Sequence, residues 1–278
     1  MLRRLLLALA LLCLAVPATA QQQVRIKIDG GPGQRVDLPG QLWHPATNSP
    51  APAVALFHGC SGPGQNNARM AQLLQSWGYV ALLVDSFSSR GLTDVCGRNW
   101  PDQAAAEARA QDLSAAALWL NAQAYVKGSQ LAAMGYSYGG GVVAMRAFTP
   151  HLQLQHNGWR AHILVYPDCN LADALGPRLK AMAPTLFAMG QLDDWTPPSQ
   201  CQALIERVVQ GRELIETKLY EGAHHSFDAL GLTVRYSPNA PNRSKPGGCC
   251  GAHYGANEGA WRQFTVDVKD FLARRLPL

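Results

Sequence analysis

Nearly unbroken apolar runs, separated by stretches with helical patterning, most constrain what this chain can fold into. A strand with one face in water alternates apolar and polar residues, whereas a strand covered on both faces is apolar throughout. Strands of the second kind that alternate with helices predict an α/β fold with a mainly parallel central sheet covered by helices on both faces. The runs are residues 53–57, 80–84, 130–134, 161–166 and 184–189.

The remaining segments complete the alternation. One more strand is expected at residues 215–220, and an antiparallel edge pair at residues 24–28 and 40–43. Residues 237–257 are rich in Pro, Gly, Asn and Cys and are expected to form a long loop, either a lid or a surface excursion. Because ligands of parallel sheets bind beyond the carboxyl ends of the strands, the loops after the strands should share one functional face. Helices are expected at about residues 66–77, 102–124, 140–147, 198–209 and 259–275.

The N-terminus has the form of a secretory signal peptide. Arg3 and Arg4 precede an apolar run at residues 5–16, and an Ala-x-Ala cleavage pattern follows. The run is too short to span a bilayer comfortably, so no stable membrane anchor is expected. We therefore expect cleavage after residues 1–20 and a secreted or periplasmic mature protein, residues 21–278, that forms a single domain.

The charge pattern argues against a nucleic-acid partner. The formal net charge of the full chain is +5, and loss of the two signal-peptide arginines lowers it from +5 to +3. The remaining basic residues are scattered along the chain rather than clustered. The oligomeric state stays open.

The cysteine count favours disulfide bonds over a metal site, because an even number in an exported protein is typical of a disulfide framework. Six cysteines remain after cleavage, and the sequence alone does not choose among their 15 pairings. The preferred pairs are Cys60 with Cys96 and Cys169 with Cys201, because each pair joins loops that should follow neighbouring strands. A zinc site at residues 249–253 is disfavoured, because adjacent cysteines chelate a tetrahedral ion poorly.

The motif Gly-x-Ser-x-Gly at residues 135–139 carries the strongest chemical signal. It follows an apolar run and precedes a helix of small residues, which is the context of a nucleophile elbow. At such an elbow the backbone turns so sharply that side chains beside the serine would collide, so glycines flank it. Ser137 is therefore the candidate nucleophile, with the amides of the next helix N-terminus facing the atom it attacks.

A serine hydroxyl is a weak nucleophile, so Ser137 requires a base within hydrogen-bond reach and a carboxylate that orients the base. In sheets of this kind the expected chain order is serine, acid and histidine, each at a strand end. The loop after the fifth apolar run carries Asp193 and Asp194, and the loop after the next strand carries His224 and His225. The order is the required one, but these residues alone leave two candidates open in each loop.

These spaced motifs resemble those of the dienelactone hydrolase family of the α/β-hydrolase superfamily, and the resemblance runs through most of the mature chain. In that family the acid lies three residues after a glycine and four before a proline, which points to Asp193. The histidine stands in a His-x-Phe pattern, which points to His225. The resemblance implies an α/β-hydrolase fold and a triad of Ser137, Asp193 and His225 that requires no metal or organic cofactor. Asp194 and His224 are then neighbours of the triad.

Ester cleavage through a tetrahedral intermediate also needs hydrogen-bond donors for the oxyanion. One donor is expected to be the amide of Tyr138, directly after the nucleophile. Matching the family's loop glycine to Gly62 makes the amide of Cys60 the second donor, in a loop that a disulfide would stiffen. His58 precedes this turn and is expected to position the loop rather than to act as a second base.

Residues 85–91 resemble a family segment whose arginine faces the active site, which makes Arg90 a candidate to hold a substrate carboxylate. The alternative, that Arg90 pairs with Asp85 or Asp94 and orders the loop, stays open. Trp195 is a further candidate for substrate binding. Other side chains that are candidates to line the cleft are Tyr138, His253 and Tyr254.

Two departures from the family change the expected chemistry. The type enzyme has a cysteine where this chain has Ser137, and the glutamate that gates that cysteine falls at Gly59. Serine favours ordinary ester hydrolysis, and export argues the same way because dienelactones are intermediates of cytoplasmic catabolism. We therefore expect an exported serine hydrolase that cleaves small-molecule carboxylic esters or lactones through an acyl-enzyme. A peptidase or acyltransferase of the same superfamily is the alternative, followed by a non-catalytic binding protein on a hydrolase scaffold.

Overall fold

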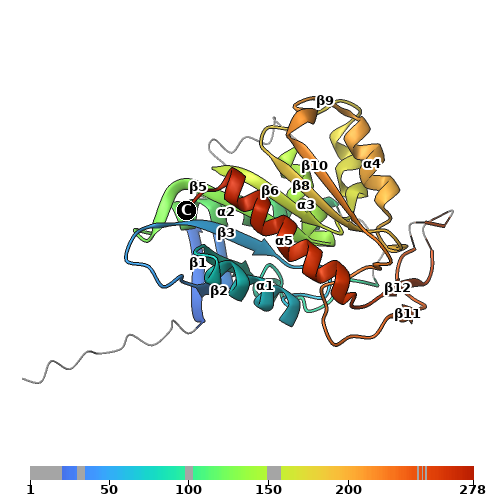
Figure 1. The fold of residues 1–278 in the computed structure, drawn as a ribbon, viewed down its shortest axis with the longest axis horizontal. Helices are drawn as coiled ribbons and strands as arrows, with labels where there is room; N and C mark the ends of the chain where they lie inside the picture. Colours follow the sequence, from blue (N-terminus) through green and yellow to red (C-terminus); the bar gives the residue numbers. More distant parts are fainter. Residues whose placement is uncertain are drawn as a thin grey trace, which may run out of the picture.

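An eight-stranded, mostly parallel sheet forms the centre of the molecule (Figure 1). The strands lie in the order β1-β2-β4-β3-β5-β6-β8-β10. The computed structural model describes residues 21–29, 35–97, 103–148, 158–242, 244–245, 247 and 249–278, so the expected signal peptide at residues 1–20 lies outside the described residues. The strands are β1 (Gln22–Asp29), β2 (Arg35–Trp43), β3 (Ala51–Phe57), β4 (Val80–Val84), β5 (Val126–Tyr136), β6 (Trp159–Val165), β8 (Thr185–Gly190) and β10 (Ile215–Tyr220).

The strand directions set the functional edge of the sheet. β1 pairs antiparallel with β2, and β2 with β4, at one side of the sheet. From β4 through β3, β5, β6 and β8 to β10 the neighbours are parallel. This confirms the expected mainly parallel sheet with an antiparallel edge pair. Because the parallel strands point the same way, the loops that follow them open at one edge.

Helices cover both faces of the sheet, which explains the apolar runs. In β3, Ala53 and Ala55 pack into the cluster that includes residues of α2, α3 and α4. The alternate residues Val54 and Leu56 pack into the cluster that includes residues of α1 and α5. Among the described residues, no helix combines the length and the apolar character needed to cross a bilayer. The helices are α1 (Gln65–Ser76), α2 (Gln103–Asn121), α3 (Tyr138–Ala147), α4 (Pro198–Glu206) and α5 (Glu258–Arg275).

Two small sheets differ from the expectations. The segment 237–257, expected to be a loop, contains β12 and begins at the end of β11, and these two strands pair antiparallel. The helix expected at residues 198–209 ends at Glu206, because the following residues form β9 beside β7. Strands of two or three residues are too short to show a period. The short elements are β7 (Leu179–Lys180), β9 (Val208–Gln210), β11 (Arg235–Ser237), β12 (Ala252–Tyr254) and the 3₁₀ helices η1 (Ser88–Arg90), η2 (Cys169–Leu175) and η3 (Arg212–Leu214).

The turn from β5 to α3 has the geometry of an elbow. Ser137 stands between them at φ 52° and ψ −116°, a backbone conformation that a non-glycine residue rarely adopts. A Cβ on Gly139 would overlap the backbone carbonyls of Phe57 and His58, and a Cβ on Gly135 would overlap the backbone of Gly139. Glycine is therefore required on both sides of the serine.

Two disulfide bonds fasten loops at the functional edge. Cys60–Cys96 joins the loop after β3 to the loop after β4, with a Cα separation of 4.9 Å. Cys169–Cys201 joins η2 to α4 with a Cα separation of 5.1 Å. These are the preferred pairs, although Cys201 lies within α4 rather than in a loop. The remaining bond joins the adjacent pair Cys249–Cys250, which the sequence had left open.

Candidate active site

Ser137, His225 and Asp193 form a chain of hydrogen bonds at the functional edge. Ser137 lies between β5 and α3, Asp193 follows β8, and His225 follows β10. Oγ of Ser137 is 3.0 Å from Nε2 of His225, and Nδ1 of His225 is 2.8 Å from Oδ2 of Asp193. All three side chains are buried. The structure thus brings these three residues together in the arrangement that nucleophilic catalysis by serine requires.

Backbone amides orient the Asp193 carboxylate, and the Thr196 hydroxyl lies beside it. Its Oδ1 accepts hydrogen bonds from the amides of Trp195 and Thr196, at 2.9 and 2.8 Å. The Thr196 hydroxyl lies 3.1 Å from both Oδ2 of Asp193 and Nδ1 of His225, and it is 3.0 Å from the backbone carbonyl of Tyr166, to which it donates. No motif in the sequence marked Thr196, although a residue three positions after an aspartate is often in a turn that the carboxylate caps.

The neighbouring candidates Asp194 and His224 have other partners. Oδ2 of Asp194 lies 2.9 Å from Nδ1 of His253. Nδ1 of His224 lies 3.0 Å from the backbone carbonyl of Leu192. In each loop, one residue of the pair therefore belongs to the hydrogen-bond chain of Ser137, and the neighbouring residue contacts other groups.

Aromatic rings pack against the His225 imidazole. Trp195 stacks on it, with the ring centroids 4.9 Å apart and the planes 29° apart. The ring of Tyr166 lies 4.7 Å from the imidazole at 60°. Tyr254 meets Trp195 edge to face at 6.1 Å. Trp195 and Tyr166 thus lie beside the imidazole, and Tyr254 lies beside Trp195. No motif in the sequence marked Tyr166 as a neighbour of the histidine.

A buried polar network reaches His225 through the Tyr166 ring. Oδ1 of Asp228 accepts a hydrogen bond from the Tyr166 hydroxyl at 2.7 Å, and Oδ2 accepts one from the Asn66 amide at 2.9 Å. Burial raises the pKa of the Asp228 carboxyl and also the pKa of Tyr166. The network ties the first turn of α1 to the loop after β10, and no motif marked it in the sequence.

A cavity of about 350 Å³ opens beside Ser137 and His225. Its lining includes Trp195 and Tyr254, and among the described lining residues Asp94 is the one acidic residue and none is a lysine or arginine. A larger cavity of about 540 Å³ lies elsewhere, and none of the described residues that line it has a charged side chain. The smaller cavity is the candidate substrate site, because it joins apolar rings to the serine and the imidazole.

The loop after β3 is held by His58. Nδ1 of His58 lies 2.7 Å from the carbonyl of Gly59, and Nε2 accepts a hydrogen bond from the amide of Ser86 at 3.2 Å. Burial is the main reason that the pKa of His58 falls to about 3, so the imidazole is neutral at neutral pH. Nδ1 therefore contacts the loop after β3 itself and Nε2 joins it to the loop after β4, which agrees with the expected positioning role.

The expected oxyanion residues lie next to the serine. Cys60 and Tyr138 both line a narrow space that Ser137 also borders. Beneath them the buried Arg109 donates to the backbone carbonyl of His58 at 2.8 Å, and its guanidinium lies 4.5 Å from the centre of the Tyr138 ring. Arg109 was missed because nothing in a helical alanine-rich segment marks one arginine as buried.

Arg90 lies in an ion pair rather than in the cavity. Its Nη1 and Nη2 lie 2.9 and 2.8 Å from the two carboxylate oxygens of Asp112, and the Asp112 side chain is 0% exposed. Asp85 instead accepts from backbone amides of η1, and Asp94 from the amide of Cys96. The alternative pairing of Arg90 with Asp85 or Asp94 is therefore not the one formed, because the partner Asp112 comes from α2. Arg90 is not a lining residue of the cavity.

Comparison with known proteins gives one consistent family. The model of the dienelactone hydrolase family matches residues 38–271. A relative from Bradyrhizobium sp. is named probable 2-oxo-3-(5-oxofuran-2-ylidene)propanoate lactonase. It is 26% identical over 194 residues, which cover 67% of this chain and 77% of the relative.

Solved structures share the fold. The dienelactone hydrolase from Anabaena variabilis ATCC 29413 superposes with a TM-score of 0.62 at 18% identity, covering 92% of this chain and 98% of its own. Esterase 2 of Thermogutta terrifontis, in a structure phosphorylated by paraoxon, gives a TM-score of 0.61 at 18% identity, covering 94% of this chain and 96% of its own. At these identities the likeness shows the fold alone.

Replacing Arg90 by Gln is expected to destabilise the fold by about 3 kcal/mol, because Asp112 is then buried without its charged partner. Urea unfolding measures the loss. The control is Arg262→Gln, which breaks the exposed ion pair between Arg262 and Glu258 and should change the unfolding free energy by no more than about 0.5 kcal/mol. Where the variant and the wild type are both folded, Arg90→Gln should change kcat/KM for a carboxylate-bearing ester and for a neutral ester by the same factor. A selective loss on the carboxylate-bearing ester would instead make Arg90 a substrate anchor.

Proposed function

The chain belongs to the dienelactone hydrolase family and is a carboxylic ester hydrolase, and we propose that it acts as a serine esterase through an acyl-enzyme on Ser137. The observation that carries this proposal is the buried chain of hydrogen bonds from Ser137 through His225 to Asp193, at the edge of a cavity. This arrangement provides a nucleophile, its base and the group that orients the base.

In the proposed reaction Oγ of Ser137 attacks the ester carbonyl carbon while Nε2 of His225 takes the hydroxyl proton. Asp193 accepts the hydrogen bond of Nδ1–H and stabilises the imidazolium that forms. The alcohol leaves with the proton from His225, and the acyl group stays on Ser137. Water then attacks the acyl-enzyme, with His225 again as base, and releases the carboxylic acid.

The developing oxyanion is proposed to bind the amides of Tyr138 and Cys60. Tyr138 is the first residue of α3, where amides of a helix N-terminus carry partial positive charge. Cys60 borders the same narrow space as Ser137, in a loop that three contacts hold: the Cys60–Cys96 bond, the His58 ring and Arg109. Rigid donors of this kind stabilise the transition state without reorganisation.

The proposed substrates are neutral esters or lactones. None of the described residues that line the cavity is a lysine or arginine, and Asp94 repels an anion. The rings of Trp195 and Tyr254 offer an apolar surface instead. The name of the Bradyrhizobium relative describes a lactone that carries a propanoate, and the cavity of the present chain has no described side-chain cation to pair with such a group.

We also propose that the protein is exported. The sequence at residues 1–20 has the charged, apolar and small-residue regions of a signal peptide. The bonds Cys60–Cys96 and Cys169–Cys201 support an oxidising compartment, because such bonds are rare in reducing cytosol.

The serine mechanism predicts that Ser137→Ala lowers kcat on p-nitrophenyl acetate by at least about 10⁴-fold, because no nucleophile remains. The variant should also lose covalent labelling by a fluorophosphonate. The control Ser49→Ala changes an exposed serine that does not line this cavity, and it should keep both the hydrolysis and the labelling. Activity that persists in Ser137→Ala would reject the acyl-enzyme, and a wild-type chain that is never labelled would favour a binding protein.

The oxyanion proposal predicts different effects of the two disulfides. The bonds close similar loops, with sequence separations of 36 and 32 residues, so replacing either pair by serines should cost about 4 kcal/mol of unfolding free energy. Only the double variant with Cys60→Ser and Cys96→Ser should also have a lower kcat, by about tenfold, because only that disulfide fixes an oxyanion donor. Equal kcat values in the two folded double variants would contradict this.

Export predicts that the chain recovered outside the cytoplasm begins at Gln21. N-terminal sequencing of that fraction measures the cleavage site. Replacing Arg3 and Arg4 by Glu should slow export, because the signal then lacks its positive region. An uncleaved chain that stays in the cytoplasm would overturn the proposal.

A further inference from the structure

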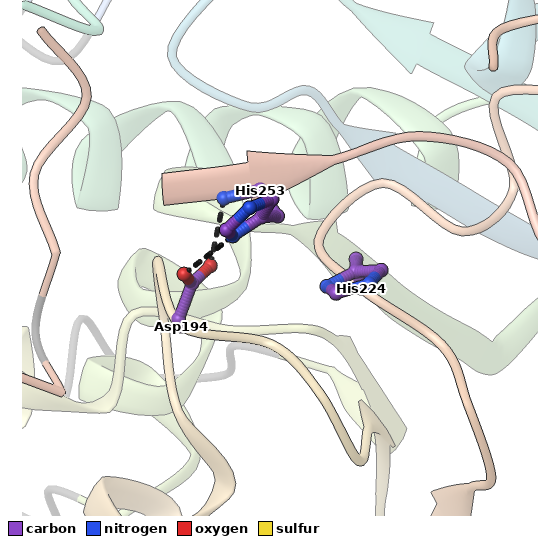
Figure 2. A group of neighbouring side chains, drawn as sticks. All are labelled: Asp194, His224 and His253. Atoms are coloured by element: carbon purple, nitrogen blue, oxygen red, sulfur yellow. Dashed lines mark hydrogen bonds and ion pairs between the residues drawn. The ribbon is translucent and has the colours of Figure 1, made fainter. Parts of the chain in front are cut away.

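We propose that Asp194, His224 and His253 bind one divalent transition-metal ion of the Zn²⁺ class, at a site separate from Ser137. One ligand atom from each side chain lies within 4.8 Å of the other two. Figure 2 shows Asp194 hydrogen-bonded to His253, with His224 beside them on another segment. Two imidazoles and one carboxylate form a ligand set that suits Zn²⁺, Ni²⁺ or Cu²⁺ better than Mg²⁺ or Ca²⁺, which prefer oxygen.

The tautomer of His224 leaves a ligand atom available. Its Nδ1 lies 3.0 Å from the backbone carbonyl of Leu192. A carbonyl only accepts hydrogen bonds, so Nδ1 carries the proton and Nε2 keeps its lone pair. Metal-binding histidines are commonly oriented in this way, by a backbone carbonyl on the opposite ring nitrogen.

Asp194 and His253 are already close to the spacing of metal ligands. Oδ1 of Asp194 accepts the backbone amide of His253 at 2.8 Å, which orients the carboxylate. Oδ2 lies 2.9 Å from Nδ1 of His253, near the separation of about 3.3 Å between ligands of a tetrahedral zinc ion. An ion can therefore replace the proton between these atoms. The His224 ring lies beside them, with its centroid 5.4 Å from that of His253, and its side chain is only partly buried.

The site would fasten three segments that also build the catalytic edge. Asp194 and His224 directly precede or follow the triad residues Asp193 and His225 in their loops. His253 lies in β12, beside the cavity residue Tyr254. An ion bound only by the folded chain raises the melting temperature by mass action. The proposal does not depend on the hydrolase activity.

The test uses the exported protein, purified without a histidine tag and treated with a chelator. Calorimetric titration with Zn²⁺ should give one ion per chain and a raised melting temperature, while Mg²⁺ should give neither. His224→Ala and His253→Ala should each weaken Zn²⁺ binding at least about tenfold. The control His44→Ala removes a histidine that packs on Tyr125, and it should bind as the wild type does.

Two further variants test whether these three side chains, and not the catalytic imidazole, hold the ion. Asp194→Asn keeps the shape of the side chain but weakens the anionic ligand, so it should lose affinity even if an alanine variant is unstable. His225→Ala should keep the ion, because the catalytic imidazole is not a proposed ligand. The proposal would be overturned if the wild type bound no Zn²⁺, if His253→Ala bound it as tightly as the wild type, or if His225→Ala lost it.

Discussion

The position of Ser137 depends on a backbone contact that only glycine permits. A side chain at Gly139 would overlap the carbonyls at the end of β3, so the first turn of α3 sits directly against that strand end. The same approach brings the loop after β3 to the serine, where a Cβ on Gly59 would lie 3.4 Å from Cβ of Ser137. One contact therefore sets both the strained backbone of Ser137 and its distance from the loop of Cys60.

Two arginines near this contact bind groups of the protein, and one histidine is kept neutral. Arg90 forms an ion pair with the buried Asp112, Arg109 donates to the backbone of His58, and the His58 imidazole is kept neutral by burial, which lowers its pKa. These groups hold the loops after β3 and β4 in place. They leave the cavity without a described lysine or arginine, which is the basis for proposing neutral substrates.

In two loops, adjacent polar residues belong to two different clusters of side chains. Asp193 and His225 face Ser137, whereas Asp194 and His224 lie with His253 of β12. The two clusters share loops but not ligand atoms. Contacts that hold the shared loops in place therefore position both clusters. The proposed ion would link β12 to the loops that carry Asp193 and His225.

The sequence by itself determined the succession of the central-sheet strands and the α-helices along the chain, the elbow, and the chain order of serine, acid and histidine. Each of these depends on periods and spacings within a short segment. It narrowed the disulfides to preferred pairs, since neighbouring parallel strands bring their loops together. Only the tertiary structure decided the partner of Arg90, the hydroxyl of Thr196 beside the imidazole, and the contact of Asp228 with Asn66. These contacts join residues separated by 22, 29 and 162 positions, and no local pattern encodes which distant side chains will meet.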